Sequence, residues 1–319
     1  MDEAQWRLLS SIARRFYLED ASKTELADEF SISRFRVARL LQQAREQGVV
    51  TIEIHDRDEP RDDLAVELAR HLGLAECVVV TAGDTGDDNR RRLARAAAPR
   101  IARTIRDGDV LGLTWGRTLV AIGEELPPLP PCTVIQLTGT VGNDLRQSPV
   151  EVIRRISGRS SVEAVAVFAP LFAASEGAAD TFRSDPSIEA ALRRYEQLAL
   201  AVVAVGSWDP PITQLGPLLT DEERADLERE GVVAEIAGIF FRADGSVIET
   251  AASRRRISVT PDQLRRSPRV MAVAGSAEKA DAIAAVSRSG ILSCLVTDDR
   301  AAAALLRLPP TAQPASLER

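Results

Sequence analysis

The chain has 319 residues, of which 45% are hydrophobic and 4% aromatic, and its formal net charge is −7. This length accommodates a small module and one large domain, and the hydrophobic content supports a core built mainly from Ala, Val, Leu and Ile. The acidic balance excludes a generally basic nucleic-acid-binding protein. The three cysteines, Cys77, Cys132 and Cys294, lack the paired spacing of a zinc site, and their odd number does not suit a disulfide framework, so we expect buried small side chains.

Membrane and metal functions are equally disfavoured. The longest apolar run, Leu198 to Gly206, is far shorter than the roughly 20 residues that a bilayer-spanning helix requires. The amino terminus lacks the basic and apolar regions of a leader, so we expect a cytoplasmic protein. His55 and His71 are the only histidines, and they suggest neither a Ser-His-Asp triad nor a metal site. No cofactor is predicted.

The first 46 residues carry the periodicity of three short helices. The first predicted helix has apolar residues at three- and four-residue intervals, namely Trp6, Leu9, Ile12, Ala13, Phe16 and Tyr17. Ser22 and Glu25 form a capping-box pattern that begins a second helix, and Ser33 supplies an N-cap for a third. Two helices joined by a tight turn, packed on a first one, predict a helix-turn-helix. Gly48 ends the third helix, and the alternating run at 49–54 predicts the strand of a wing.

The positive charge of this module is concentrated on the third helix. Phe30 to Arg45 contains four arginines and no acidic residue, whereas residues 1–56 have 8 basic and 10 acidic side chains, a net charge of −2. Concentrated charge suits phosphate contacts in a DNA groove, although it also fits an ordinary helical pair with a solvated basic face. A single copy would bind DNA weakly, so we expect a dimer or higher homo-oligomer. The predicted DNA-contacting residues are Lys23, Thr24, Ser33, Arg34, Phe35, Arg36 and Arg39.

Beyond an acidic linker at 55–63, strands and helices alternate. Strands are predicted at 76–82, 109–115, 132–138, 162–168, 199–206, 232–241, 269–274 and 291–297. Helices are predicted at 62–72, 88–105, 117–126, 149–157, 220–230, 276–288 and 298–307, with more than one helix near 176–196, before a disordered tail. Such alternation predicts parallel strands with helical crossovers, hence an α/β, Rossmann-like doubly wound sheet over 57–319 that follows a winged helix-turn-helix at 1–56.

Ligands of such sheets bind beyond the carboxyl ends of the strands, and polar residues gather at several predicted ends. A tight turn at Trp115-Gly116 leads into a helix at Arg117, and Gly275 precedes a helix with Lys279 in its first turn. A cation at a helix amino end opposes the helix dipole, and a bound phosphate would resolve the conflict. Solvated side chains at loop edges are the alternative. Glu235 lies within an apolar strand, where it faces either a sugar hydroxyl or a neighbouring arginine.

Several ordered segments resemble the SorC family of bacterial sugar-binding transcriptional regulators over nearly the whole chain. They include SISRFRVARLLQQAREQGVVTIEI, GDVLGLTWGRTL, VIQLTGTVG, GVVAEIAGIFFRADG and VMAVAGSAEKADAI. The resemblance implies a large domain akin to sugar-phosphate isomerases that senses a sugar or a phosphorylated sugar, and a homo-oligomer, a tetramer in many members. It also implies a double-stranded DNA operator as partner.

Carried over by position, the resemblance implies an effector site with four parts. Gly116, Arg117 and Thr118 would hold phosphate, Thr138 and Gly139 would line the pocket, Glu235 would accept sugar hydroxyls, and Lys279 would pair with phosphate. The alternative function is a sugar-phosphate isomerase or deaminase with Glu235 or Lys279 as an acid-base residue. The fold supports both functions, but no catalytic residue is predicted because no base-orienter pair is recognisable.

Overall fold

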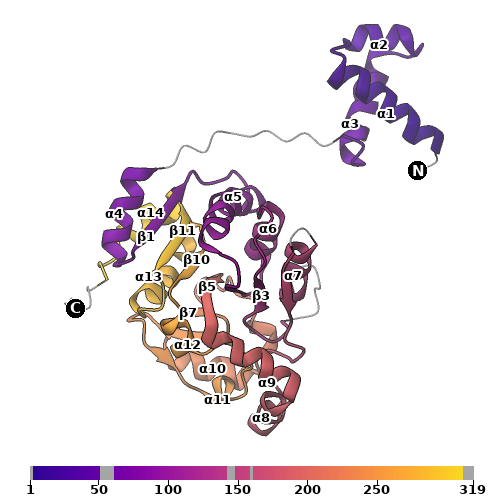
Figure 1. The fold of residues 1–319 in the computed structure, drawn as a ribbon. Helices are drawn as coiled ribbons and strands as arrows, with labels where there is room; N and C mark the ends of the chain where they lie inside the picture. Colours follow the sequence, from indigo (N-terminus) through magenta and orange to yellow (C-terminus); the bar gives the residue numbers. More distant parts are fainter. Residues whose placement is uncertain (1–2, 51–60, 142–147, 159–160, 312–319) are drawn as a thin grey trace. The chain divides into compact units, whose positions relative to one another are not determined.

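The computed structural model describes residues 3–50, 61–141, 148–158 and 161–311. Contacts divide the chain into two compact units, residues 1–57 and 58–319. Figure 1 draws both units.

The small unit contains three helices, α1 (Glu3–Leu18), α2 (Lys23–Glu29) and α3 (Arg34–Glu46). The capping box at the start of α2 is confirmed, because Glu25 donates its N–H to the Ser22 hydroxyl and accepts the Ser22 N–H at 2.8 Å. Ser33 caps α3 through the Arg36 N–H. The helices bury a shared core that includes Ile12, Leu26, Ala27, Val37 and Leu41.

The turn between α2 and α3 places Ser31 at φ 52°, in the left-handed region. The Ile32 N–H donates to the Ala27 carbonyl at 2.9 Å and closes this turn. After α3, Val49 and Val50 pack on Leu9, Ala13 and Ala44 without forming a strand. The rest of the predicted wing, from residue 51, lies outside the described residues, as do most of the linker and the predicted tail from residue 312.

The large unit is built on a seven-stranded parallel sheet in the order β1-β11-β10-β5-β2-β3-β4. Its strands are β1 (Glu76–Val80), β2 (Val110–Leu113), β3 (Thr133–Gln136), β4 (Glu163–Val165), β5 (Leu198–Val203), β10 (Val270–Val273) and β11 (Cys294–Asp298). Every pairing within this sheet is parallel. The predicted parallel α/β sheet is therefore confirmed, and the carboxyl ends of its strands share one edge.

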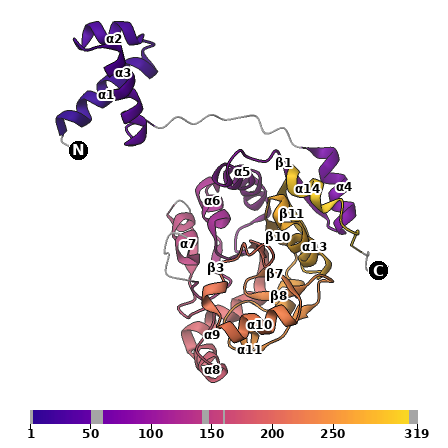
Figure 2. The same ribbon diagram turned by 180° about the vertical axis from the view of Figure 1, so that it is seen from behind.

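Helices cover both faces of the sheet, as Figure 1 and Figure 2 show from opposite sides. One face is covered by α5 (Gly86–Thr104), α6 (Arg117–Glu125) and α7 (Pro149–Ser157). The other is covered by α4 (Asp62–Leu72), α9 (Pro186–Arg193), α12 (Pro261–Arg266), α13 (Ala280–Arg288) and α14 (Asp299–Leu305). Both faces are apolar, and the three cysteines are buried as expected.

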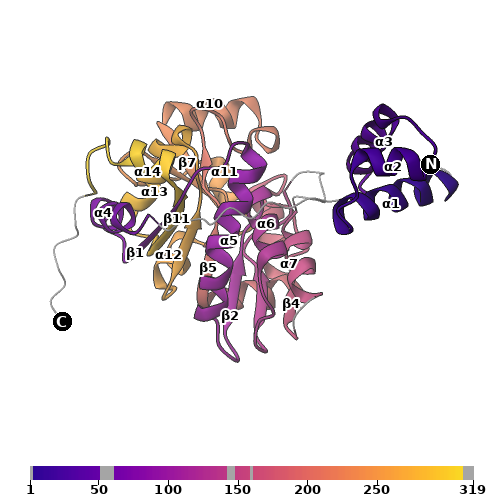
Figure 3. The same cartoon turned by 90° about the horizontal axis from the view of Figure 1, so that it is seen from above.

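The predicted strand at 232–241 is wrong as a single element. It is a hairpin of β7 (Val232–Ile236) and β8 (Ile239–Arg242), in a small antiparallel sheet with β6 (Gly206–Ser207) and β9 (Val247–Ile248). Ala237 and Gly238 form the turn, both with positive φ. Both arms are apolar and buried, so the sequence reads as one continuous apolar run. α10 (Asp221–Arg229) lies beside β7 in Figure 3.

The helices predicted near 176–196 are confirmed as α8 (Glu176–Ser184) and α9, because Asp185 ends one and caps the next before Pro186. Other helical predictions differ from the structure. α11 (Ala251–Arg254) and α12 were not predicted. The helix predicted from 276 begins with a 3-10 turn at Ala277–Lys279, and Lys279 is the N-cap residue of α13 without a side-chain capping hydrogen bond. In the part of the chain that the structure describes, no helix is both long and apolar enough to cross a membrane.

Candidate functional site

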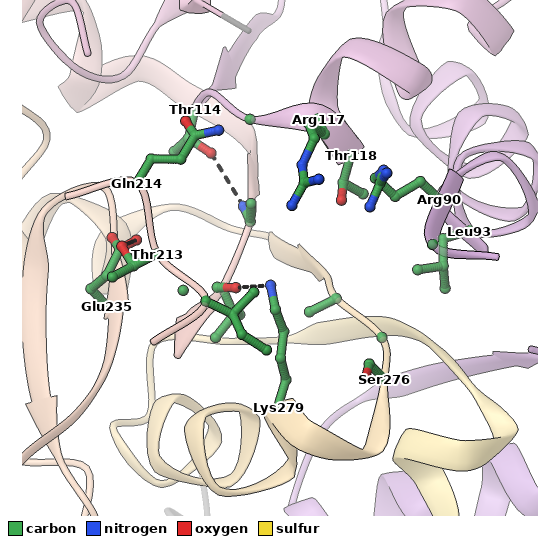
Figure 4. A pocket seen from close by; sticks show the side chains of 18 of the residues that line it. Arg90, Leu93, Thr114, Arg117, Thr118, Thr213, Gln214, Glu235, Ser276 and Lys279 are labelled. Carbon is green, nitrogen blue, oxygen red and sulfur yellow. Dashed lines mark hydrogen bonds between the residues drawn. The ribbon is translucent and has the colours of Figure 1, made fainter. Parts of the chain in front are cut away.

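A cavity of about 430 Å³ opens at the carboxyl edge of the parallel sheet. The segments that follow β2, β5 and β10 line it, together with α5, α6 and the hairpin residues Glu235 and Ala237. We name it the carboxyl-edge cavity. Of the residues predicted from sequence, the structure brings five to this cavity, namely Gly116, Arg117, Thr118, Glu235 and Lys279. Figure 4 shows the labelled side chains around it.

The amino end of α6 forms one wall. Gly116 is the N-cap residue at φ 112°, and no side chain caps this helix end. Within the described residues, the guanidinium of Arg117 makes no hydrogen bond or ion pair. Unpaired helix N–H groups beside a guanidinium attract anions, because the helix dipole and the cation act in the same direction on a negative ligand.

Lys279 projects into the cavity from the opposite wall, as Figure 4 shows. Its Nζ donates to the Val205 carbonyl at 2.7 Å. Burial lowers the pKa of Lys279, and the nearby cations Arg117 and Arg90 act in the same direction, whereas Glu235 opposes the shift. Three cations therefore converge on this space, and an anionic ligand would relieve their mutual repulsion.

Glu235 is a buried carboxyl group at the floor of the cavity, with 5% of its surface exposed. Its Oε1 accepts the Thr213 hydroxyl at 3.0 Å, and its Oε2 accepts the Gly238 N–H at 3.3 Å. Burial raises the pKa of Glu235 to about 7, while these two hydrogen bonds and Lys279 partly oppose the rise. Glu235 can thus accept or donate a hydrogen bond to a ligand hydroxyl near neutral pH.

Glu235 predicts a pH-dependent stability that is measurable by urea unfolding. The folded pKa of about 7 exceeds the ordinary value of 4.5, so the folded state binds more protons between these values. The contribution is favourable below pH 4.5 and is lost as pH rises through 7. Each pKa unit corresponds to about 1.4 kcal/mol, so wild type should lose roughly 2 to 4 kcal/mol more than Glu235→Gln between pH 4.5 and 8. Parallel pH profiles of the two proteins would contradict this expectation.

A second buried carboxyl group supports the cavity wall from behind. Asp298 is fully buried, and its Oδ2 accepts Asn89 Nδ2 at 2.6 Å and the Ser276 N–H at 2.7 Å. Its Oδ1 accepts the Ala301 N–H at 2.8 Å. A Cβ at Gly275 would lie 2.1 Å from Asp298 Oδ2, so glycine is required for this close approach. Asp298 thereby fixes Asn89 and Ser276, both of which line the cavity.

The sequence did not predict several residues that line the carboxyl-edge cavity. They are Asn89, Arg90, Thr114, Thr213, Gln214 and Ser276. Arg90 lies in α5, where it pairs with Asp87, and one arginine in an arginine-rich helix gives no distinguishing signal. Thr114 directly follows β2 and accepts the Ala204 N–H at 3.2 Å, so the rule that ligands lie at strand ends would have found it.

Thr138 and Gly139 do not line the carboxyl-edge cavity. Both follow β3, but backbone pairing with residues 257 and 258 fixes this segment in place. Thr138 is buried and pairs with Ser258, and the Gly139 N–H donates to the Ile257 carbonyl at 2.8 Å. A Cβ at Gly139 would lie 2.5 Å from the Pro170 backbone. Gly139 therefore allows this loop to pack closely against Pro170. From sequence alone, such a packed loop cannot be distinguished from an open polar loop.

In the small unit, the residues predicted to contact DNA are all exposed. Ser33 caps α3, and Arg34, Phe35 and Arg36 form its first turn, with Arg39 one turn later. Phe35 has 90% of its surface exposed, although it is a large apolar side chain. Lys23 and Thr24 begin α2. This face of α3 combines arginines with one apolar side chain, a composition suited to the edges and phosphates of a DNA groove.

Comparisons with known proteins find similarity that covers residues of both units. Residues 58–307 match the family model described as "Putative sugar-binding domain". A deoxyribonucleoside regulator of Bacillus subtilis is 30% identical over 320 residues, which cover 96% of this chain and 99% of that protein. The crystal structure of the full-length sorbitol operon regulator SorC from Klebsiella pneumoniae superposes with a TM-score of 0.70 at 25% identity, covering 96% of this chain and 99% of that one. The chain belongs to the SorC family of sugar-binding transcriptional regulators.

The SorC-family likeness extends over the small unit as well. The transcriptional regulator LsrR of Escherichia coli is 27% identical over 306 residues, which cover 94% of each chain. The family model begins at residue 58, whereas these full-length relatives also align with residues that precede it. The likeness to these relatives therefore covers residues of both units of this chain.

Proposed function

We propose that this protein regulates transcription of carbohydrate-metabolism genes by binding a double-stranded DNA operator under the control of a sugar or sugar-phosphate effector. One observation supports the binding of an effector. Arg117, Lys279 and the uncapped amino end of α6 all line the same cavity. Glu235, which accepts hydrogen bonds at the floor, suits the hydroxyl groups of a sugar. Such a regulator acts in the cytoplasm, where bacterial DNA lies.

A thermal-shift screen of the whole protein against sugars and their phosphates tests the effector half. A ligand that binds only the folded state raises the unfolding temperature in a concentration-dependent manner. We expect a phosphorylated sugar to give a larger shift than its unphosphorylated parent, because three cations face the cavity. A response confined to unphosphorylated sugars would reject the anion site.

For the DNA half, Arg36→Ala and Arg34→Ala should each weaken operator binding. The expected cost is about 1 to 3 kcal/mol for a lost base contact, with relaxed specificity at one position, and a smaller, sequence-independent loss for a phosphate contact. Arg14→Ala is the matched control, because Arg14 is also exposed but belongs to α1. Fluorescence anisotropy with operator DNA at fixed salt measures the loss. Normal binding by both α3 variants would exclude this face of α3.

We further propose that the active form is a homo-oligomer, a tetramer in its complete form. The first 56 residues have a net charge of −2, so one copy gains little from the phosphate backbone, whereas several copies on repeated half-sites add their contacts. Sedimentation of the protein with and without operator DNA tests this. A monomer that binds operator at full affinity would be incompatible with the proposal.

We propose that the carboxyl-edge cavity binds its ligand without catalysing a reaction. Both oxygens of Glu235 are already engaged by Thr213 and Gly238, which suits a fixed recognition group better than a mobile base. Turnover assays with phosphorylated pentoses and hexoses address the isomerase or deaminase alternative. Robust turnover that Glu235→Gln abolishes would establish an enzyme.

A further inference from the structure

A second cavity, of about 440 Å³, lies at the opposite edge of the parallel sheet, where the strands begin. It is similar in size to the carboxyl-edge cavity, and we name it the amino-edge cavity. Glu76 and Cys294 are the first residues of β1 and β11, and Arg269 immediately precedes β10. The last turns of α5 and the loop that follows them complete its wall. No part of the proposed effector site belongs to it.

Four arginines line the amino-edge cavity, namely Arg100, Arg103, Arg106 and Arg269. Arg100 pairs with Glu76 at 3.1 Å, and the other lining acid, Asp109, accepts the backbone N–H of Arg106 at 2.8 Å. Among the described residues, the guanidinium groups of Arg103, Arg106 and Arg269 have no hydrogen-bond or ion-pair partner. Two positive charges remain in excess at this cavity, in a chain whose net charge is −7.

The helix dipole explains only part of this arrangement. Arg103 lies in the last turn of α5, where a cation is favourable beside the unpaired carbonyl groups. Arg269 comes from another segment at the start of β10, and Arg106 lies in the loop beyond the helix. Arginines from two separate stretches of the chain, 103–106 and 269, line one cavity, which exceeds what capping a helix requires.

The floor of the amino-edge cavity is apolar and shaped by an irregularity of the sheet. Leu200, Met271 and Cys294 line it, and each has less than a tenth of its surface exposed. The pairing of β2 with β5 shifts between Val110 and Leu111, so Ala199 has no partner in β2 and lines the cavity. Such bulges redirect a strand and are frequent beside binding sites.

We propose that the amino-edge cavity binds a small organic anion that carries a phosphate or carboxylate group on an apolar or aromatic body. The guanidinium groups match the bidentate geometry of these anionic groups and stack on flat rings. The apolar floor adds no competing polar group beneath the body of the ligand. This site is independent of the proposed effector site and of any DNA contact of α3.

Phenyl phosphate is a suitable probe, and the Arg117→Ala/Lys279→Ala protein is a suitable background because it lacks two of the three cations of the carboxyl-edge cavity and keeps only Arg90, which pairs with Asp87. Calorimetry should show saturable binding in this background. Adding Arg103→Ala and Arg269→Ala should weaken it at least tenfold. Adding Arg265→Ala, an exposed arginine paired with Asp262, is the matched control and should leave binding unchanged. Absent binding, or binding that survives the loss of Arg103 and Arg269, would overturn the proposal.

Two further titrations in the same background distinguish the class of ligand. Inorganic phosphate should bind at least several-fold more weakly than phenyl phosphate, because it lacks a ring that can stack on a guanidinium group. Equal affinities would remove the apolar body from the proposal. Non-operator duplex DNA should not displace phenyl phosphate. Displacement that is lost in the Arg103→Ala/Arg269→Ala protein would instead assign the arginines to a nucleic-acid backbone.

Discussion

Lys279→Met is expected to weaken the binding of a phosphorylated effector by roughly 10- to 100-fold, and to abolish its effect on operator affinity. A hydrogen bond to a charged group contributes about 1.5 to 3 kcal/mol, and each 1.4 kcal/mol corresponds to a factor of ten in affinity. Lys279 Nζ lies in the cavity with a single protein partner, the Val205 carbonyl, among the described residues. Calorimetry with the effector found by screening measures the loss.

Glu278 offers a control of opposite sign for this experiment. It lines the same cavity, is exposed, and precedes Lys279, so Glu278→Gln removes repulsion of the anion without removing a donor. Affinity should remain equal or rise slightly. In both variants the affinity for operator without effector should match wild type, because the substitutions lie outside the DNA-contacting unit. An unchanged effector response in Lys279→Met would remove Lys279 from the site.

Asp298→Asn is expected to lower the stability of the large unit by about 2 to 4 kcal/mol, since a buried donor without an acceptor carries a cost of this order. The carboxyl group accepts hydrogen bonds on both oxygens, from Asn89 and Ser276 on one and from Ala301 on the other. An amide in either orientation presents a donor to one of these donors. For a unit of this size, the melting temperature should fall by roughly 5 to 15 °C.

Asp299→Asn is the matched control, because it changes the same group one residue along the chain. Asp299 accepts the Ala82 N–H at 3.0 Å, but its other oxygen lies 3.6 Å from Arg61, and the side chain is 25% exposed. A partly exposed pair of this kind contributes about 0 to 1 kcal/mol. Calorimetric melting of both variants tests the difference. Similar melting temperatures would show that Asp298 does not organise the cavity wall.

The helix-turn-helix and the alternating elements were predictable because their signals are local. Capping by Ser22 and Ser33 depends on residues three positions away, and both caps are present in the structure. The strand ends at Gly116 and Gly275 were located in the same way, since an apolar strand, a glycine and a helix start are adjacent in sequence. The cations Arg117 and Lys279 were therefore found before any tertiary contact was known.

The hairpin at 232–242 could not be predicted from local sequence signals. The period of the apolar residues is unchanged across Ala237 and Gly238 because both arms are buried, so nothing local marks the turn. The position of Glu235 depends on that turn, since the Gly238 N–H holds its Oε2. From the sequence, an arginine is one expected neighbour of Glu235, whereas the structure gives Thr213 and Lys279 as its polar neighbours.

The sequence by itself determined the small helical unit, the parallel sheet and the cationic strand ends, because capping, apolar periodicity and turn residues act within a few positions. Only the tertiary structure decided which strand ends share a cavity. It brought Arg90 to Arg117 and Lys279, and it kept Thr138 and Gly139 apart from them. The order of the strands in the sheet brings together residues that are far apart in the chain. Tertiary packing also buries the polar loop after β3, whereas the loops after β2 and β10 face the cavity.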